Sequence, residues 1–341
     1  MAERTIDTPE TPSASTPSPT AENGLSPEAR FGFICALLAY TIWGGFPIYI
    51  KLLETVDPLE VVSQRIAWSV PFGALIISLR KQWRETIAAA MSAKTLLLLG
   101  ASATVISVNW FFYVWAVANE RVLEASLGYY INPLMFVAAG VLVLGETLTR
   151  AQWVGIGLAT AGVFVLTVGA GVFPWVAFIL ALAFTAYGYI RKQTPVGATP
   201  GLFIETTLLA PVAIGLLIWL SGHGGLTFGA EGTRMDVLLA LSGPMTVLPL
   251  TLFALGARRL KLSTIGFIQY IGPTGQFILG LYYGEPFTLA HGICFGLIWI
   301  GLAITSIDAL RDRPKTVNAG PSTPPPALKT DRVASESPKS S

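Results

Sequence analysis

Residues 39–44 read AYTIWG and residues 183–188 read AFTAYG, so the chain carries one short pattern twice. Two further pairs lie at nearly the same separation along the chain: LGYYINP at 127–133 with FIQYIGP at 267–273, and the Gly-Glu steps at 145–146 and 284–285. Weak internal similarity between two apolar halves is how many secondary transporters are built. The repeat therefore predicts two similar halves and favours a transport function.

The composition indicates a membrane protein. The 341 residues are 52% hydrophobic and only 12% charged, whereas soluble domains carry about 25% charged residues. Crossing a bilayer as a helix takes about 20 mostly apolar residues. We expect an all-α membrane protein with ten transmembrane helices, at residues 31–50, 60–79, 95–117, 123–144, 151–168, 172–190, 201–220, 236–257, 263–283 and 287–307.

The ten spans divide into two halves flanked by polar tails. Residues 31–168 form the first repeat of five spans and residues 172–307 the second. Residues 1–30 and 311–341 are rich in Pro, Ser, Thr and charged residues, a composition typical of disordered segments. The first tail also lacks the apolar core of a signal peptide, so we expect the first span to direct insertion.

The basic residues predict the orientation in the membrane. Ten spans place both termini on one side, and that side carries eighteen of the 22 Lys and Arg residues. By the positive-inside rule, both tails are then cytoplasmic. Because each half has an odd number of spans, the second half is inverted relative to the first. Inverted repeats hold the substrate near the midplane, at the repeat interface.

The pattern A-[YF]-T-x-[WY]-G in the first span of each half resembles the EamA domain of the drug/metabolite transporter superfamily. Several stretches, which together reach across all ten spans, are similar to its RarD (chloramphenicol-sensitive protein) subgroup: WGGFPIYIKLL (43–53), VVSQRIAWS (61–69), NWFFYVWAV (109–117), EASLGYYINPL (124–134), LPLTLFALGARRL (248–260) and STIGFIQYIGPT (263–274).

The resemblance implies a multi-pass permease of the bacterial cytoplasmic membrane. Members of the family export amino acids, other metabolites or toxic compounds, so it implies an exporter of a small organic solute. It also implies that spans 1–4 and 6–9 of the two EamA repeats surround a central cavity, while spans 5 and 10 are peripheral. This last step is an analogy of fold.

Small residues in the fifth and tenth spans support the peripheral placement. They are Gly155, Ala159 and Gly162 in one span, and Gly292, Gly296 and Gly301 in the other. Faces of small residues let two helices approach closely. We expect them to pack against each other, with a dimer face as the alternative, so both a monomer and a homodimer remain open.

Polar and aromatic residues within the spans are candidates for the cavity wall. Spans 123–144 and 263–283 are the most polar, and each contains a proline that frees backbone carbonyls. We expect these helices to break at Pro133 and Pro273 and to line the solute path; the alternative is that the prolines are kinks and the tyrosines interhelical contacts. The candidate cavity residues are Trp43, Asn109, Tyr113, Tyr130, Asn132, Tyr187, Gln269, Tyr270 and Gln276.

Charged residues within a bilayer are functional candidates because their burial is unfavourable. Arg65 and Glu205 qualify, and they lie at equivalent positions of the two repeats. Inversion places them at different depths, so we do not expect them to pair. We expect an outer gate of Arg65 with Glu124 or Glu120, and an inner gate of Glu205 with Lys261 or Arg259. The alternative is static: Arg65 extends towards the interface and Glu205 lies near it.

Two other sets of residues have simpler interpretations. Inversion puts Glu146 and Glu285 on opposite membrane faces, where we expect each to lie between two spans. Cys35 and Cys294 lie inside spans and fit neither a disulfide framework nor a metal site.

The motifs of several other function classes are missing from the sequence. It contains no H-E-x-x-H, no G-x-S-x-G and no Walker A motif. We therefore expect a secondary transporter and no enzyme, with no cofactor, metal or nucleic-acid partner. The solute is expected to be amino-acid-like or aromatic, and the lipid bilayer is the other partner. A lipid-carrier translocase is the alternative, followed by an intramembrane enzyme.

Overall fold

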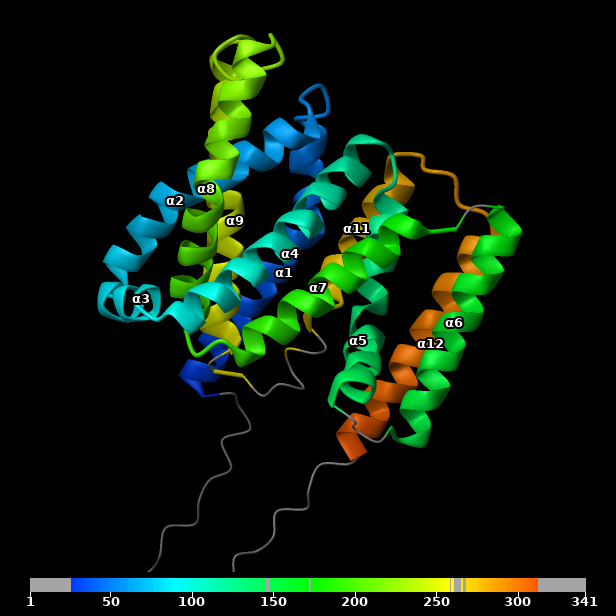
Figure 1. Ribbon diagram of the computed structural model, residues 1–341. Coiled ribbons are helices and arrows are strands. Elements are labelled where there is room, and N and C mark those ends of the chain that lie inside the picture. The colour runs from blue at the N-terminus through cyan, green and yellow to red at the C-terminus, as the bar shows by residue number, and fades with distance from the viewer. Residues whose placement is uncertain are drawn as a thin grey trace, which may run out of the picture.

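The computed structural model describes residues 26–144, 148–171, 173–257, 259–260, 265 and 268–311. Within these ranges the chain forms helices and no strand, as the all-α prediction requires (Figure 1). In chain order the helices are α1 (Pro27–Lys51), α2 (Pro58–Leu79), α3 (Trp83–Ala90), α4 (Ala93–Ala118), α5 (Val122–Leu144), α6 (Arg150–Ala170), α7 (Trp175–Gln193), α8 (Ala198–Gly222), α9 (Thr233–Ala257), α11 (Ile271–Tyr282) and α12 (Leu289–Arg311).

Seven of the described helices are long and apolar enough to cross a membrane: α1, α2, α4, α6, α8, α9 and α12. Large apolar side chains such as Leu97, Phe164 and Ile218 are exposed on the outside of the bundle, which suits a surface surrounded by lipid. The described helices thus indicate a multi-pass membrane protein. Helices α5, α7 and α11 occupy the other three predicted positions, so the number of ten spans stays a prediction.

The helix ends follow recognisable sequence signals. The Asp57 side chain accepts a hydrogen bond from the Leu59 N–H (2.7 Å) directly before Pro58, a residue suited to the first helical position because its missing N–H would have no partner there. Thr149 begins α6 with a reciprocal capping box to Gln152, which satisfies two backbone donors. Gly171 ends the same helix at φ +67°, a conformation that glycine adopts without strain.

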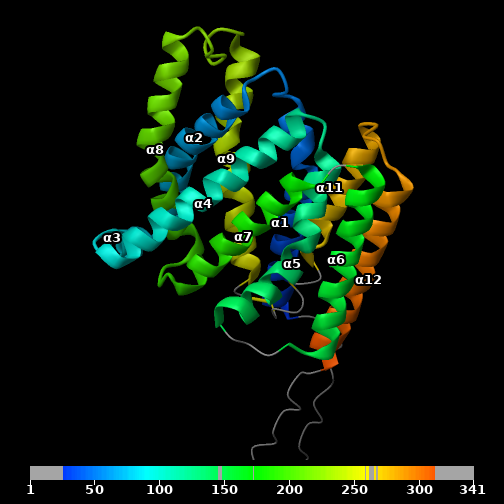
Figure 2. The same cartoon turned by 45° about the vertical axis from the view of Figure 1, so that its right-hand side comes forward.

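Helices α6 and α12 lie side by side at the edge of the bundle (Figures 1 and 2). A Cβ atom on Gly301 would lie 3.0 Å from the Gly155 carbonyl oxygen, and one on Gly162 would lie 3.0 Å from the Cys294 carbonyl oxygen. These glycines therefore allow the two backbones to touch. The predicted packing of these two spans is present at these positions, although Gly157 and Gly296 face open space.

The remaining long helices form the body of the bundle. Helix α1 packs between α9 and α11, and α7 packs between α4 and α5. Helix α2 packs against both α8 and α9. The beginning of α1 and the end of α12 lie at the same end of the bundle (Figure 1). Helices α1, α2, α4, α5, α7, α9 and α11 all contribute side chains to a central space.

The two predicted helix breaks differ from each other in the structure. Helix α5 continues through Pro133 to Leu144, so the break predicted there is corrected: a proline removes only one helical hydrogen bond, and the surrounding helices hold the segment in place. Helix α11 begins at Ile271, and Pro273 falls in its first turn, where the missing N–H has no helical partner to lose.

Some predictions fall on residues outside the described ranges. They concern Lys261, Glu146 and most of the two tails, residues 1–25 and 312–341. A short helix, α3, was not among the expected spans; it lies in the basic connection between α2 and α4. Cys35 and Cys294 are both free and buried.

Candidate functional site

A cavity of about 220 Å³ lies in the centre of the bundle. Its wall includes most of the predicted candidates: Trp43, Asn109, Tyr113, Asn132, Tyr187, Gln269, Tyr270 and Gln276, together with both prolines, Pro133 and Pro273. These residues come from α1, α4, α5, α7 and α11 and from the turn before α11. The structure thus brings together residues that are far apart in the sequence. Their role in binding stays a prediction.

Tyr130 is the exception and is corrected. Its hydroxyl lies 2.7 Å from the Thr274 hydroxyl, and its ring packs edge-on against Phe295 and Trp299 of α12. The neighbouring Tyr129 lines the cavity instead, and its hydroxyl donates to Asn109 Oδ1 (3.3 Å). Adjacent residues on a helix point about 100° apart, so only one of the two tyrosines faces the cavity.

Several polar atoms of the wall have no hydrogen-bond partner in the part of the chain that the structure describes. Asn109 Nδ2 donates to the Leu180 carbonyl (3.0 Å), and Gln276 Nε2 donates to the Trp43 carbonyl (3.2 Å). In contrast, the Tyr113 hydroxyl, Asn132 Oδ1 and Gln276 Oε1 are buried without a hydrogen bond among the described residues. Buried polar groups nearly always have a partner, so these three atoms are available to a molecule in the cavity.

Arg65 also lines the cavity, and it is 7% exposed. Its Nε donates to the Thr246 hydroxyl (2.6 Å). Its guanidinium carbon lies 4.5 Å from the centre of the Trp110 ring and 5.0 Å from that of Phe46, within the range of cation–π attraction. Within the described ranges no carboxylate forms an ion pair with it. The site therefore holds a positive charge between aromatic rings.

The predicted outer pair of Arg65 with Glu124 is not formed. Glu124 lies in the first turn of α5, where its carboxylate accepts the Val176 N–H (2.8 Å) at the start of α7. The same carboxylate forms an ion pair with Arg121 (3.5 Å). Glu124 thus joins α5 to α7, while Arg65 faces the centre of the bundle. Glu120, the other predicted partner, lies in the turn after α4.

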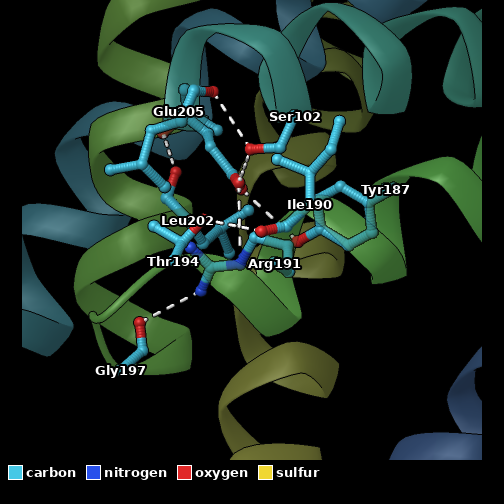
Figure 3. A network of polar contacts seen from close by, with 10 residues as sticks. Ser102, Tyr187, Ile190, Arg191, Thr194, Gly197, Leu202 and Glu205 are labelled. Atoms are coloured by element: carbon cyan, nitrogen blue, oxygen red, sulfur yellow. Dashed lines mark hydrogen bonds and ion pairs between the residues drawn. The ribbon is translucent and has the colours of Figure 1, made fainter. Parts of the chain in front are cut away.

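Glu205 is fully buried at the centre of a second polar cluster, shown in Figure 3. Its carboxylate accepts a hydrogen bond from the Ser102 hydroxyl (2.5 Å) and a longer one from the Tyr187 hydroxyl (3.4 Å). Arg191, at the end of α7, forms an ion pair with it (3.7 Å). Because Tyr187 also lines the cavity, this cluster lies directly behind the cavity wall.

The Arg259 pairing of the predicted inner gate is corrected in the same way. Glu205 is paired with Arg191, whereas Arg259 donates to the Leu255 carbonyl and lies over the Phe31 ring. Lys261, the other predicted partner, is outside the described residues. Arg191 reaches Glu205 because the guanidinium lies directly on Gly201, where even a Cβ atom would collide with it.

Sequence reasoning missed other residues of the cavity and of the cluster. Tyr40 and Phe184 occupy the same position of the repeated pattern and both line the cavity, so the repeat itself could have identified them. Arg191 follows Tyr187 by four residues and therefore shares its helix face, which could have identified it as the partner of Glu205. Phe46, which contacts Arg65, carried no comparable signal.

Comparisons with known proteins give a consistent result. Residues 30–168 match the EamA-like transporter family. An uncharacterized transporter of Vibrio cholerae is 42% identical over 285 residues, which cover 83% of this chain and 94% of the relative. Protein RarD of Streptomyces exfoliatus is 41% identical over 285 residues (83% and 90%). Protein RarD of Escherichia coli is 39% identical over 290 residues (85% and 98%).

The fold also has a match among solved structures. One crystal structure of a protein superimposes with a TM-score of 0.54, and the match covers 82% of this chain and 98% of the other. The two sequences are 17% identical, so this match concerns the fold alone.

Proposed function

Because the chain belongs to the EamA family of transporters, in its RarD-type group, we propose that it exports a small organic solute across the bacterial cytoplasmic membrane by alternating access. The family and the named relatives establish a membrane transporter of the drug/metabolite superfamily. Export, the kind of solute and the mechanism are our proposal. The observation that carries it is the aromatic cavity in the centre of the bundle.

The packing of the helices supports an inverted repeat. Helix α1 of the first half packs against α9 and α11 of the second half. In the matching way, α7 of the second half packs against α4 and α5 of the first half. The correspondence extends to single contacts: the Ser102 hydroxyl oxygen lies 3.0 Å from the Leu99 carbonyl oxygen, and the Ser242 hydroxyl oxygen, at the matching position of the second half, lies 2.5 Å from the Leu239 carbonyl oxygen. Two related halves around one cavity can open to either side in turn.

We further propose that residues 31–168 and 172–307 are the two repeats of five spans and that both termini are cytoplasmic. The charge distribution supports this orientation, because eighteen of the 22 basic residues fall on one side of a ten-span arrangement. The shared end of the bundle at which α1 begins and α12 ends agrees with it (Figure 1).

Solute uptake into proteoliposomes tests the proposal. The purified protein is reconstituted and supplied with radiolabelled amino acids or amphenicol-type drugs, with and without a pH gradient. We expect at least one of these solutes to move faster than in protein-free vesicles. Dependence on the pH gradient would indicate proton coupling, and its absence would indicate exchange or facilitated movement. Comparison of inside-out and right-side-out vesicles determines the direction.

A matched pair of tryptophan variants ties transport to the cavity. Trp43→Ala removes a ring from the cavity wall, whereas Trp153→Ala removes a ring that is 63% exposed on α6. We expect uptake to fall about tenfold or more in the first variant and to stay near the wild-type rate in the second. Lipid scrambling without movement of any solute would contradict the proposal and favour a lipid-carrier translocase.

A further inference from the structure

The proposed function leaves the chemical class of the solute open, and Arg65 restricts it. Resting on that function, we infer that the central cavity binds the carboxylate of a small aromatic monoanion, with Arg65 as its anchor. Arg65 is a cation of the cavity wall, and among the described residues of that wall there is no Asp or Glu.

The charge of Arg65 is not balanced within the described part of the protein. A buried charge is strongly unfavourable unless an opposite charge and hydrogen bonds compensate for it. Glu205, at the equivalent position of the second half, is already compensated by Arg191 and Ser102. An anion that enters the cavity would therefore supply the missing compensation.

The orientation of the Arg65 side chain fits this role. The Thr246 hydroxyl accepts a hydrogen bond from the Arg65 Nε–H, and the rings of Phe46 and Trp110 pack against the guanidinium. The terminal Nη groups form no hydrogen bond among the described residues. Two parallel N–H donors of a guanidinium match the two oxygens of a carboxylate. The fixed Nε and the ring contacts hold these donors in place before a solute arrives.

The rest of the cavity restricts the body of the solute. About 220 Å³ lies below the roughly 300–1,000 Å³ of drug-sized ligand pockets, so the solute is small. Rings of Trp43, Tyr129 and Tyr187 line the space and favour a flat apolar or aromatic body. Among the described residues of the wall, Arg65 is the single cation, and it matches a single negative charge, which favours a monocarboxylate over a phosphate with two charges. The unpartnered oxygens of Asn132 and Gln276 can accept from an N–H or O–H donor on that body.

Equilibrium binding to the purified protein in nanodiscs tests the inference without requiring transport. Three probes share one body and differ in charge: 3-phenylpropanoate, its neutral amide and 3-phenylpropylammonium. Hydrogen bonds to a charged group contribute enough for about a ten- to hundredfold difference in affinity. We expect the carboxylate to bind the wild-type protein more tightly than the amide by about that factor, and the ammonium to bind most weakly.

Variants identify Arg65 as the source of the preference. Arg65→Gln should reduce the difference between carboxylate and amide to less than about twofold, and Arg65→Lys should retain part of it, because the lysine charge lacks the planar pair of donors. Arg121→Gln is the matched control. The guanidinium carbon of Arg121 also lies near two rings, 5.7 Å from the centre of the Trp115 ring and 5.6 Å from that of Trp175. Arg121 is paired with Glu124, however, and does not line the cavity. This control should keep the full preference.

The outcomes separate this inference from the proposed function. Equal binding of carboxylate and amide, binding of no probe, or a preference that persists in Arg65→Gln would overturn the inference, even if the protein transports other solutes. Carboxylate binding that depends on Arg65, without uptake of the same probe into proteoliposomes, would support the inference and count against transport. Thermal unfolding of each variant shows whether it is folded.

Discussion

Arg65 and Glu205 occupy corresponding positions of the two halves, and their surroundings differ in one decisive respect. Each is buried, and each is hydrogen-bonded to a hydroxyl on a helix of the other half: Arg65 to Thr246 on α9, and Glu205 to Ser102 on α4. Glu205 has a cationic partner in Arg191, whereas Arg65 has no anionic partner among the described residues. One charge is neutralised by the protein, and we infer that the other binds the solute.

The repeat shows where this difference arises. In the second half, Arg191 follows the Tyr187 of the repeated pattern by four residues. In the first half, the residue four positions after the matching Trp43 is Pro47, which carries no charge. The two proposed repeats therefore differ at this position, and the difference leaves only Glu205 with a charged partner from the matching helix.

Removing Glu205 should have the largest effect on stability. Glu205→Ala leaves Arg191 without its carboxylate, and loss of one member of a buried pair costs about 3–5 kcal/mol. We expect the free energy of unfolding in mild detergent to fall by an amount of this order. The double variant Glu205→Ala/Arg191→Ala removes both charges and should lose less. Wild-type stability in the single variant would show that Arg191 is not compensated by Glu205.

Displacing Arg191 without changing its charge should have an intermediate effect on stability. Gly201→Ala places a methyl group where the guanidinium lies, and overpacking of this kind costs about 1–3 kcal/mol. Gly215→Ala, in the same helix, is the control because no atom lies within 4 Å of its Cβ position. There alanine should gain about 0.5–1 kcal/mol from helix propensity. Equal unfolding temperatures of the two variants would argue against a tight fit of Arg191.

Removing Arg65 should change the free energy of unfolding only slightly, and in the opposite direction. Arg65→Met deletes an uncompensated charge, while the Thr246 hydroxyl keeps its own hydrogen bond to the Ser242 carbonyl (2.9 Å). Replacing buried charge by an apolar side chain is often neutral or stabilising, so without solute we expect the free energy of unfolding to stay equal or rise by about 1 kcal/mol. A loss of about 3 kcal/mol or more would mean that Arg65 has an internal partner after all.

The charge of Glu285 is compensated in a third way, by backbone N–H groups. We expect its replacement to have the smallest effect on stability. Its carboxylate, between α11 and α12, accepts the N–H groups of Val122 (2.5 Å) and Leu123 (2.8 Å) at the start of α5. Burial raises the pKa of Glu285, and these two N–H groups lower it without reversing the shift.

The raised pKa gives a pH dependence of known sign. A carboxyl group whose pKa is higher in the folded state binds its proton more tightly there, so its contribution to stability is complete below the ordinary pKa and is lost as the pH rises through the raised one. Glu285→Gln does not titrate. The difference in unfolding temperature between wild type and this variant, measured from about pH 4 to 8, should therefore shift against the wild type as the pH rises; a constant difference would contradict this.

Much of the cavity could be predicted from the sequence because polar residues are rare within apolar spans. Asn109, Asn132 and Gln276 stand out in such segments, and the repeated pattern marked Trp43 and Tyr187. All five line the cavity. A polar side chain in a membrane helix is tolerated mainly where it faces protein or water, so composition alone indicates which side chains face inwards.

The contacts of the charged residues could not be predicted because they depend on helix rotation and depth. Periodicity could not decide between Tyr129 and Tyr130, which are neighbours on one helix. The partner of Glu205 is Arg191, at the end of α7, and the partner of Glu124 is the Val176 N–H, at the start of the same helix. Span boundaries known to within a few residues leave a side chain's depth uncertain by several ångströms, which exceeds the length of an ion pair.

The most direct test of the difference between Arg65 and Glu205 is a structure with a labelled solute. The protein is crystallised with 3-(4-bromophenyl)propanoate, and the anomalous signal of bromine locates the ring. We predict the bromophenyl ring among the aromatic side chains of the cavity and the carboxylate within hydrogen-bond distance of the Nη atoms of Arg65. A solute outside the cavity, or one whose carboxylate points away from Arg65 or binds Arg191, would contradict the account.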